Sequence, residues 1–138
     1  MIDITVADLH FVARLERERA PNTAAALLRL LPLVGSLLQA RWSGESAWLP
    51  LGDLVLGVGE ENATDQPAPG ELLLYPQGVS ETELLFPYGP TVFASKFGRQ
   101  RGNHVLTLVE GQDQLRELGR RILWLGAQSI RLDIPASV

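Results

Sequence analysis

The sequence predicts a mainly β protein, a closed barrel of about eight short strands with two helices. Apolar and polar residues alternate in many short segments, which is the period of a half-buried strand. Gly, Pro and other turn-forming residues separate these segments. Only two segments have a helical composition. A closed barrel is the expected arrangement because closure leaves no strand edge exposed.

The first part of the chain predicts a hairpin, a helix and a second hairpin. Residues 2–6 (IDITV) and 10–16 (HFVARLE) alternate as antiparallel strands. Residues 20–32 (APNTAAALLRLLP) favour a helix, in which Asn22 or Thr23 caps the first turn and Pro32 with Gly35 ends it. The second hairpin is expected to join the segments SLLQARW and SAWLPL through Ser43, Gly44 and Glu45.

The remainder predicts a long loop, further strands and a second helix. Residues 51–71 are rich in Gly, Pro, Asn and acids, which indicates a strand fragment followed by a surface loop, a frequent location of functional residues. The later elements are expected at residues 72–76, 82–89, 91–95 and 104–110 (strands), 111–121 (helix) and 129–134 (strand). No repeat or linker interrupts the chain, so residues 1–138 are expected to form a single domain.

Composition excludes several classes of function. The 138 residues carry a net charge of -4, which argues against a nucleic-acid binder because phosphate binding needs a concentrated basic face. The absence of cysteine excludes disulfides and thiolate chemistry, and two distant histidines, His10 and His104, indicate no metal site and no cofactor. The longest apolar run is broken by Arg29 and is too short for a membrane span. The first residues lack a signal-peptide pattern, so a bacterial-type cytoplasm is the expected location.

Both ends of the chain resemble the cyclophilins. Residues 12–27 (VARLERERAPNTAAAL) resemble the cyclophilin opening, in which a strand leads through an acidic bend and a Pro-x-Thr step into a helix. Residues 102–118 (GNHVLTLVEGQDQLREL) resemble the Gly-x-His-Val strand that leads through a Glu-Gly turn into a helix. The Phe-His-Arg, Gln-Gly-Gly-Asp and Gln-Phe-Phe motifs of the isomerase pocket are missing. The segments ARWSGE, PGELLLYP, SETELLFPYGP and FASKFG are instead similar to a family of short cyclophilin-like bacterial proteins of unknown function.

The resemblance implies roles for two residues. His104 matches the histidine of the Gly-x-His-Val strand, which lies at the wall of the cyclophilin groove; the alternative is a hydrogen bond that anchors the start of the strand. Arg41 is the candidate for the groove arginine, which polarises the prolyl amide in the isomerases. Its alternative role is an ion pair with Glu45 across the hairpin.

Alternation along the strands suggests further candidates. Glu81 and Glu83 are expected to project from one side of their strand, where two carboxylates can serve acid–base chemistry if one pKa is raised; a solvent-exposed face is the ordinary alternative. Trp42 and Trp48 lie six residues apart on the predicted hairpin and can share a face, either as an aromatic wall or as barrel core. Tyr88 belongs either to the core or to a pocket.

One basic segment stands out in this acidic chain. Lys96, Arg99 and Arg101 precede His104, and together they can hold an anionic group or form an ordinary solvated loop. The sequence thus offers eight candidate binding residues: Arg41, Trp42, Glu45, Glu81, Glu83, Tyr88, Lys96 and His104.

Three functions are compatible with these residues. The favoured one is binding of a small molecule or peptide in a groove walled by Arg41, Trp42, Tyr88 and His104. The second is prolyl cis-trans isomerisation assisted by Arg41. The third is a small-molecule hydrolase or isomerase that uses Glu81 or Glu83 with His104. The apolar helix, with Arg29 as its only charge, further predicts a homo-oligomer.

Overall fold

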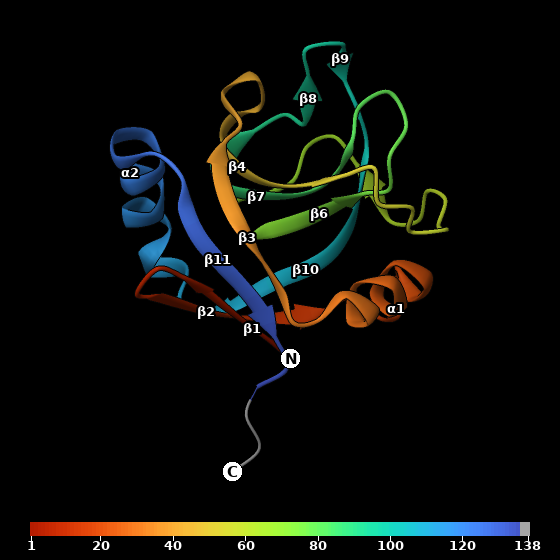
Figure 1. The fold of residues 1–138 in the computed structure, drawn as a ribbon, viewed down its shortest axis with the longest axis horizontal. Coiled ribbons are helices and arrows are strands. Elements are labelled where there is room, and N and C mark those ends of the chain that lie inside the picture. Colours follow the sequence, from red (N-terminus) through yellow and green to blue (C-terminus); the bar gives the residue numbers. More distant parts are fainter. Residues whose placement is uncertain (136–138) are drawn as a thin grey trace.

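The computed structural model describes residues 1–135 and confirms the closed barrel (Figure 1). Eight antiparallel strands follow one another in the order β2-β1-β11-β3-β4-β7-β6-β10, and β10 pairs with β2 to close the ring. These strands are β1 (Ile2–Val6), β2 (Leu9–Leu15), β3 (Leu33–Gln39), β4 (Gly44–Gly52), β6 (Glu71–Tyr75), β7 (Thr82–Thr91), β10 (Gly102–Glu110) and β11 (Gln128–Asp133). The short β5 (Ala63–Thr64) pairs with β10, and β8 (Ala94–Ser95) with β9 (Gly98–Arg99) forms a separate small hairpin.

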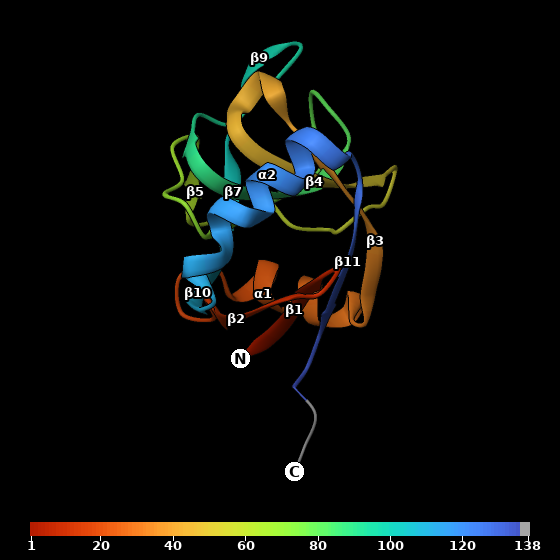
Figure 2. The ribbon, with the colours of Figure 1, turned by 90° about the vertical axis from the view of Figure 1, so that its left-hand side faces the viewer.

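Two helices lie on opposite sides of the barrel. They are α1 (Pro21–Leu30) and α2 (Leu115–Leu125), and Figure 2 shows α2 crossing the side of the barrel that faces the viewer. Single 3-10 turns, η1 (Arg41–Ser43) and η2 (Gln112–Gln114), precede β4 and α2. Neither α-helix of the described residues is long and apolar enough to cross a membrane.

The main apolar core fills the inside of the barrel. Alternate residues of β1 and β2, such as Ile4 and Phe11, are fully buried, as the alternation along these strands predicts. Leu27 of α1 and Leu118 of α2 pack into the same core. The interior therefore holds side chains and leaves the outer wall of the barrel as the place for a site.

The first turn of α1 is capped differently from the expectation. Neither Asn22 nor Thr23 caps the helix, because both lie inside its first turn and the residue at the N-cap is Ala20. The carboxylate of Glu61 accepts a hydrogen bond from the backbone N–H of Thr23 and another from Asn22 Nδ2, at 3.3 Å. A carboxylate at this position also stabilises the positive end of the helix dipole. The long loop thus supplies the cap from a distance in sequence.

Two predicted strand segments are wrong in detail. Trp42 was expected on a strand but lies in the η1 turn, because β3 ends at Gln39 and β4 begins at Gly44. The strand expected at residues 91–95 is divided between the end of β7 and the short β8. Both differences concern the connections near the top of Figure 1.

The strand β7 is buried on both faces. Thr82, Leu84 and Phe86 point to one side, and the last two belong to the main core. Leu85 points to the other side and joins a second, smaller apolar cluster of Ala40, Leu73, Tyr75, Leu85 and Phe93, with Trp48 packed against it. This second cluster lies on the outer face of the barrel wall, and it forms the support on which the candidate site is built.

Candidate functional site

An open pocket of about 530 Å³ lies beside the second apolar cluster, on the outer wall of the barrel. Three connecting segments surround it: the η1 turn, the loop between β6 and β7, and the small β8–β9 hairpin. The residues that line it are Trp42, Trp48, Asp53, Gln77, Gly78, Val79, Ser80, Glu81, Glu83, Ser95, Lys96 and Phe97. We call this the tryptophan pocket. It collects Trp42, Glu81, Glu83 and Lys96 from the eight candidate residues.

The aromatic wall of the tryptophan pocket consists of Trp42 and Trp48. Their ring centroids lie 6.0 Å apart with an interplanar angle of 68°, an edge-to-face arrangement. Trp42 is 49% exposed, so much of its ring remains free for contact with another molecule. Phe97, on the β8–β9 hairpin, is also exposed, and Lys96 Nζ lies 5.1 Å from the centroid of its ring. The two tryptophans lie side by side as expected, but Trp42 reaches Trp48 from the η1 turn and not from a strand.

Glu83 is the unusual residue of the site. It lies on β7, opposite Pro50 of β4 and Tyr75 of β6 in the strand register, and it is only 4% exposed. Within residues 1–135, no hydrogen bond or ion pair joins its carboxyl group to another side chain. Burial, and then the charge of Glu81, raises the pKa of Glu83 to about 8. The two acids line the same pocket, as alternation predicts, but the solvent-exposed alternative holds for Glu81 alone.

Hydrogen bonds fix the loop that forms the rim. The hydroxyl of Tyr75 accepts from the backbone N–H of Val79 at 3.0 Å, which ties the loop to the second apolar cluster. Gln100 Nε2 donates to Ser80 Oγ at 2.8 Å, and Gln100 is itself buried. The rim is therefore built from the protein's own contacts, as expected of a preformed ligand site.

Glu45 and Tyr88 lie in a different hollow. They line a second pocket with Arg116, Gly119, Arg120, Leu123 and Trp124 of α2. The hydroxyl of Tyr88 donates to Gln39 Oε1 at 2.7 Å, and burial raises the pKa of Tyr88. Its ring belongs to the main core, on the opposite side of β7 from Glu83. Tyr88 thus belongs to the main core and also lines the second pocket, outside the tryptophan pocket.

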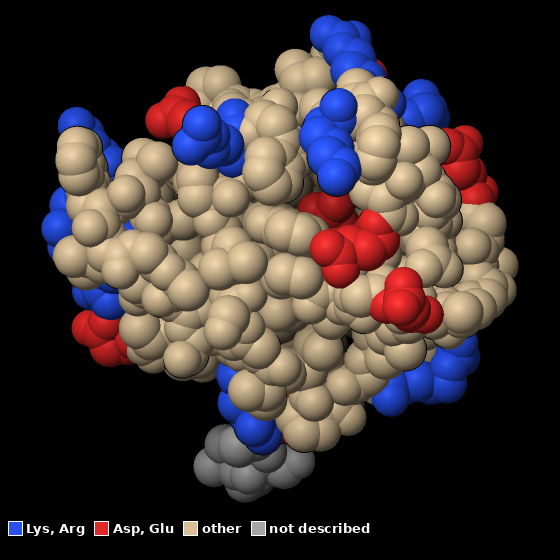
Figure 3. Space-filling model, turned by 45° about the horizontal axis from the view of Figure 1, so that its top comes forward, with Lys and Arg blue, Asp and Glu red and all other residues tan. Residues whose placement is uncertain are grey.

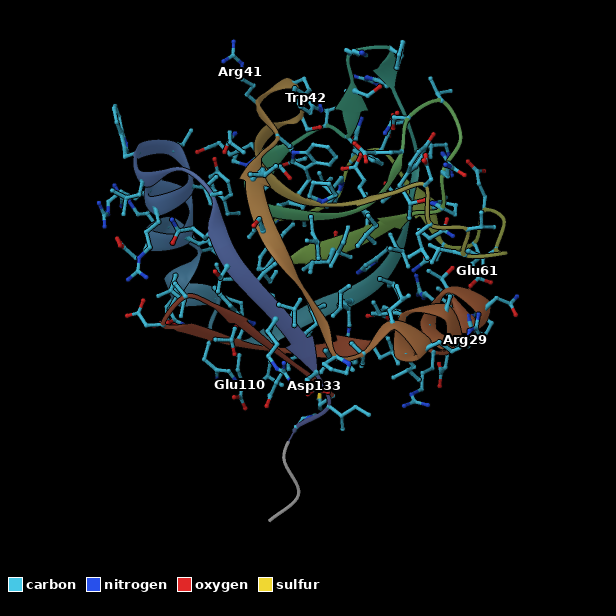
Figure 4. The ribbon with its side chains drawn as sticks, in the orientation of Figure 1. Arg29, Arg41, Trp42, Glu61, Glu110 and Asp133 are labelled. Atoms are coloured by element: carbon cyan, nitrogen blue, oxygen red, sulfur yellow. The ribbon has the colours of Figure 1, made fainter. Side chains whose placement is uncertain are left out.

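Arg41 and His104 are not among the residues that line the tryptophan pocket. Arg41 is exposed and points away from the barrel in Figure 4. No ion pair joins it to Glu45 within residues 1–135, so the expected cross-hairpin pair is wrong. His104 Nε2 lies 2.7 Å from Thr107 Oγ1, which in turn donates to Glu16 Oε1 at 2.7 Å. The ring partner of His104 thus lies on its own strand, β10, and Thr107 extends this hydrogen-bonded chain to Glu16.

Two of the three cations in the basic segment form ion pairs with acidic residues of the long loop. Arg99 lies 3.6 Å from Asp65, and Arg101 lies 3.6 Å from Glu60 and donates to the backbone oxygen of Ala63. Lys96 is left at the tryptophan pocket. The groove of Arg41, Trp42, Tyr88 and His104 is thus not assembled around one hollow, because alternation and the η1 turn send these side chains in different directions.

Several residues of the site carry no signal in the sequence. Asp53 follows β4 and lines the tryptophan pocket beside the two glutamates, although nothing in its surroundings in sequence distinguishes it from other acids of the long loop. The rim residues 77–80 are an ordinary polar turn. Trp48 is the exception, since its even spacing from Trp42 already suggested a common aromatic wall.

The charge around the site is predominantly negative. Asp53, Glu81 and Glu83 line the tryptophan pocket against the single cation of Lys96. On the face shown in Figure 3, acidic side chains gather between basic ones at a hollowed part of the surface. Within residues 1–135, no group of three His, Asp or Glu side chains is arranged to hold a metal ion.

Fold and site together define a β-barrel protein with a surface pocket walled by tryptophan and acidic side chains. The chain belongs to the family DUF3830, described as a protein of unknown function, whose match covers residues 2–134. No curated protein is significantly similar to it in sequence.

Two solved structures are similar to this fold. One is McbB in complex with tryptophan, with a TM-score of 0.79 and 24% identity; the similarity covers 100% of this chain and 46% of the McbB chain. This chain therefore spans less than half the length of that protein. The other is the hypothetical protein AF2241 from Archaeoglobus fulgidus, with a TM-score of 0.58 and 17% identity over 96% of this chain and 92% of that one. At these identities the similarity shows the barrel fold.

Proposed function

We propose that the protein binds a small molecule with a flat, mainly apolar body in the tryptophan pocket. A single observation carries this proposal: two tryptophans and a buried acid without a partner line one open pocket of about 530 Å³. This volume is within the range of ligand sites, which combine an apolar lining with a few polar groups. A flat ring can lie on the free surface of Trp42, and the polar groups can orient it.

The similarity to McbB supports a small organic ligand. McbB is described in complex with tryptophan, a molecule with a flat ring and a charged end. The tryptophan pocket of this chain has an aromatic wall for the first feature and charged groups for the second. Tryptophan is therefore a reasonable first probe, together with a panel of other small aromatic amines, acids and alcohols.

Nuclear magnetic resonance of the indole N–H groups tests the proposal directly, because the chain has three tryptophans. Trp42 and Trp48 line the tryptophan pocket, whereas Trp124 is 79% exposed on α2 and lines the second pocket. A ligand of the tryptophan pocket is expected to shift the signals of Trp42 and Trp48 and to leave that of Trp124 unchanged. The same titration reports the affinity.

Matched variants identify the site. Trp42→Leu is expected to weaken binding at least 10-fold, because it removes the free aromatic surface, while Trp124→Leu leaves the affinity unchanged. Shifts centred on Trp124, or none with any probe at millimolar concentration, would contradict the proposal.

Proton transfer to or from the bound molecule is a second candidate function. The raised pKa of Glu83, about 8, favours it, because a group that gives and takes protons works best with a pKa near the working pH. His104, the partner proposed from the sequence, does not line this pocket, so Glu83 would act with Glu81. Incubation of a bound probe in D2O, followed by mass spectrometry, tests this: deuterium at a carbon atom is expected with the unaltered protein and not with Glu83→Gln.

Prolyl isomerisation, which the cyclophilin resemblance implies, receives less support. It depended on Arg41 at the wall of the groove, and Arg41 points away from the barrel (Figure 4). An isomerase assay on a proline peptide, with Arg41→Ala as comparison, remains its direct test.

Self-association also stays a proposal, but on another surface. Ala24, Ala26 and Leu27 of α1 are buried by the protein's own core. Three consecutive exposed apolar residues, Leu123, Trp124 and Leu125, stand at the end of α2 instead. Light scattering of the unaltered protein and of Trp124→Ser tests this surface, with a smaller particle expected for the variant.

A further inference from the structure

We propose that the ligand of the tryptophan pocket carries a cationic nitrogen on its aromatic body, with Glu83 and Glu81 holding the nitrogen and Trp42 and Trp48 holding the ring. This inference rests on the proposed function and adds the chemical class of the ligand. Its starting point is the carboxyl group of Glu83, which lines the pocket, is 4% exposed as a residue, and has no partner among the described side chains.

A buried acid without a partner is costly to keep. Burial disfavours the charged form of this carboxyl group, and no described side chain replaces the water that it has lost. Its oxygen atoms are not among the fully enclosed unpaired atoms, so they remain open to the pocket. The strand around Glu83 is paired on both sides, with β4 and with β6, so the carboxyl group cannot turn away by a movement of the backbone. A hydrogen-bond donor brought by a ligand would satisfy it. An ammonium group is such a donor and also carries the opposite charge.

The other ionisable groups of the tryptophan pocket also favour a positively charged ligand. Asp53, just after β4, and Glu81, just before β7, line the pocket as acids, whereas Lys96 on the β8–β9 hairpin is the cation. Tyr75 of β6 uses its hydroxyl to hold Val79. Lys96 is exposed and lies over the ring of Phe97, at the rim of the pocket. Among the four charged or ionisable side chains that line the pocket, Glu83 alone is buried, and acids outnumber the single cation by three to one.

An organic cation fits better than a metal ion. The acids are not arranged as a metal-binding group within residues 1–135. Hard cations such as Ca²⁺ and Mg²⁺ prefer a shell of oxygen ligands, whereas this pocket places two indole rings beside its carboxyl groups. Tryptophan faces attract organic cations and also bury apolar surface. The combination of indole rings and carboxylates therefore selects an amine attached to a ring.

Binding of such an amine should release a proton. Burial, with the neighbouring charge of Glu81, raises the pKa of Glu83, so its carboxyl group is mostly protonated in the free protein at pH 7. A bound ammonium group favours the carboxylate and lowers that pKa again. Binding is then expected to tighten as the pH rises from 6 to 8, because less work is needed to remove the proton. A simple amine keeps its charge over this range, since its pKa is about 10.

Calorimetry with two indole probes tests the inference. Tryptamine carries an ethylamine chain and tryptophol carries a hydroxyl in its place, so the two differ in the cationic nitrogen. At pH 8 we expect tryptamine to bind at least 10-fold more tightly than tryptophol. Titrations in two buffers of different ionisation enthalpy are expected to show release of a proton with tryptamine, and its affinity to fall about 10-fold at pH 6.

Variants assign the effect to the acids. Glu83→Gln is expected to remove both the proton release and the preference for tryptamine, while Glu110→Gln, an exposed residue of β10, changes neither. Glu81→Gln keeps the test valid if Glu83→Gln fails to fold, since Glu81 is exposed; it is expected to reduce the preference in part. Equal affinity for the two probes overturns the inference and leaves the proposed function standing. No binding of either probe, or of tryptophan and the rest of the panel, overturns both.

Discussion

The side chain of Asn103 donates a buried hydrogen bond to Thr23, with 3.0 Å between Nδ2 and Oγ1. The contact joins β10 to α1 across 80 residues of sequence. The same Asn103 side chain donates to the backbone oxygen of Gly59 at 2.8 Å and accepts from the backbone N–H of Glu61 at 3.2 Å. One fully buried amide thus holds the long loop, the first helix and the barrel wall together.

Asn103→Ala is expected to lower the free energy of unfolding by about 3 kcal/mol, because it removes three hydrogen bonds and leaves the buried hydroxyl of Thr23 without this donor. Urea denaturation followed by circular dichroism measures the loss. Asn22→Ala is the matched control, since its amide makes one long hydrogen bond on an exposed part of α1. A similar loss in both variants would show that Asn103 does not have this organising role.

Glu61→Ala is expected to destabilise the protein by about 1 kcal/mol, the usual effect of losing a helix cap. Partial burial alone would raise the pKa of Glu61, but hydrogen bonds from Thr23 and Asn22 lower it below its ordinary value. A lowered pKa means that the cap is present above the pKa of the unfolded chain and is lost as the pH falls through the lower value of the folded state. The difference between the two proteins should therefore shrink under acidic conditions. Glu60→Ala, next in sequence and exposed, is expected to show neither effect in the same denaturation series.

The sequence predicts the barrel well because strand alternation is a local property. Ile4 and Phe11 face the core as their spacing requires. The helix cap could not be predicted in the same way, because Glu61 reaches α1 from a distant loop whose path depends on Asn103. Local candidates for the cap, Asn22 and Thr23, were therefore named instead.

The candidate site was predicted in part for the same reason. Alternation places Glu81 and Glu83 on one side of β7, but it does not say whether that side is covered. Trp48 and the β8–β9 hairpin line the same pocket as these acids, and both belong to other parts of the fold. The resemblance to cyclophilins suggested Arg41 and His104, and their actual directions are set by the η1 turn and by Thr107. Burial, the property that makes Glu83 unusual, thus arises only from the assembled fold.

Gly119→Ala is expected to destabilise the protein by about 1–3 kcal/mol, although alanine has a higher helix propensity than glycine. Alanine in place of glycine would stabilise an isolated helix by about 1 kcal/mol. A Cβ atom at this position of α2, however, would overlap the ring of Tyr88. That ring is buried and its hydroxyl is held by Gln39, so it cannot easily move away, and overpacking of this kind is costly. Thermal denaturation measures the change.

A second substitution separates overlap from other causes. Tyr88→Leu removes the ring that Gly119 faces, so adding Gly119→Ala to it is expected to cost less than adding it to the unaltered protein. Equal costs in the two backgrounds would mean that the close contact with Tyr88 does not limit the size of residue 119.

Glu83→Gln is expected to change how stability depends on pH. The pKa of Glu83 is about 8 in the folded protein, against an ordinary value of 4.5, so between these values the unfolded chain gives up a proton that the folded protein keeps. The free energy of unfolding therefore falls as the pH rises, at most by about 1.4 kcal/mol per pH unit from this group. Glutamine has no such proton.

Urea denaturation at pH 5, 6, 7 and 8 measures this dependence. The two proteins are expected to differ little at pH 5, and Glu83→Gln is expected to be more stable by about 3 kcal/mol at pH 8. Glu110→Gln, on the exposed end of β10 and far from the pocket in Figure 4, should keep the slope of the unaltered protein. Parallel curves for all three proteins would mean that Glu83 ionises in the folded state as it does in water, and that its carboxyl group is not held neutral by the tryptophan pocket.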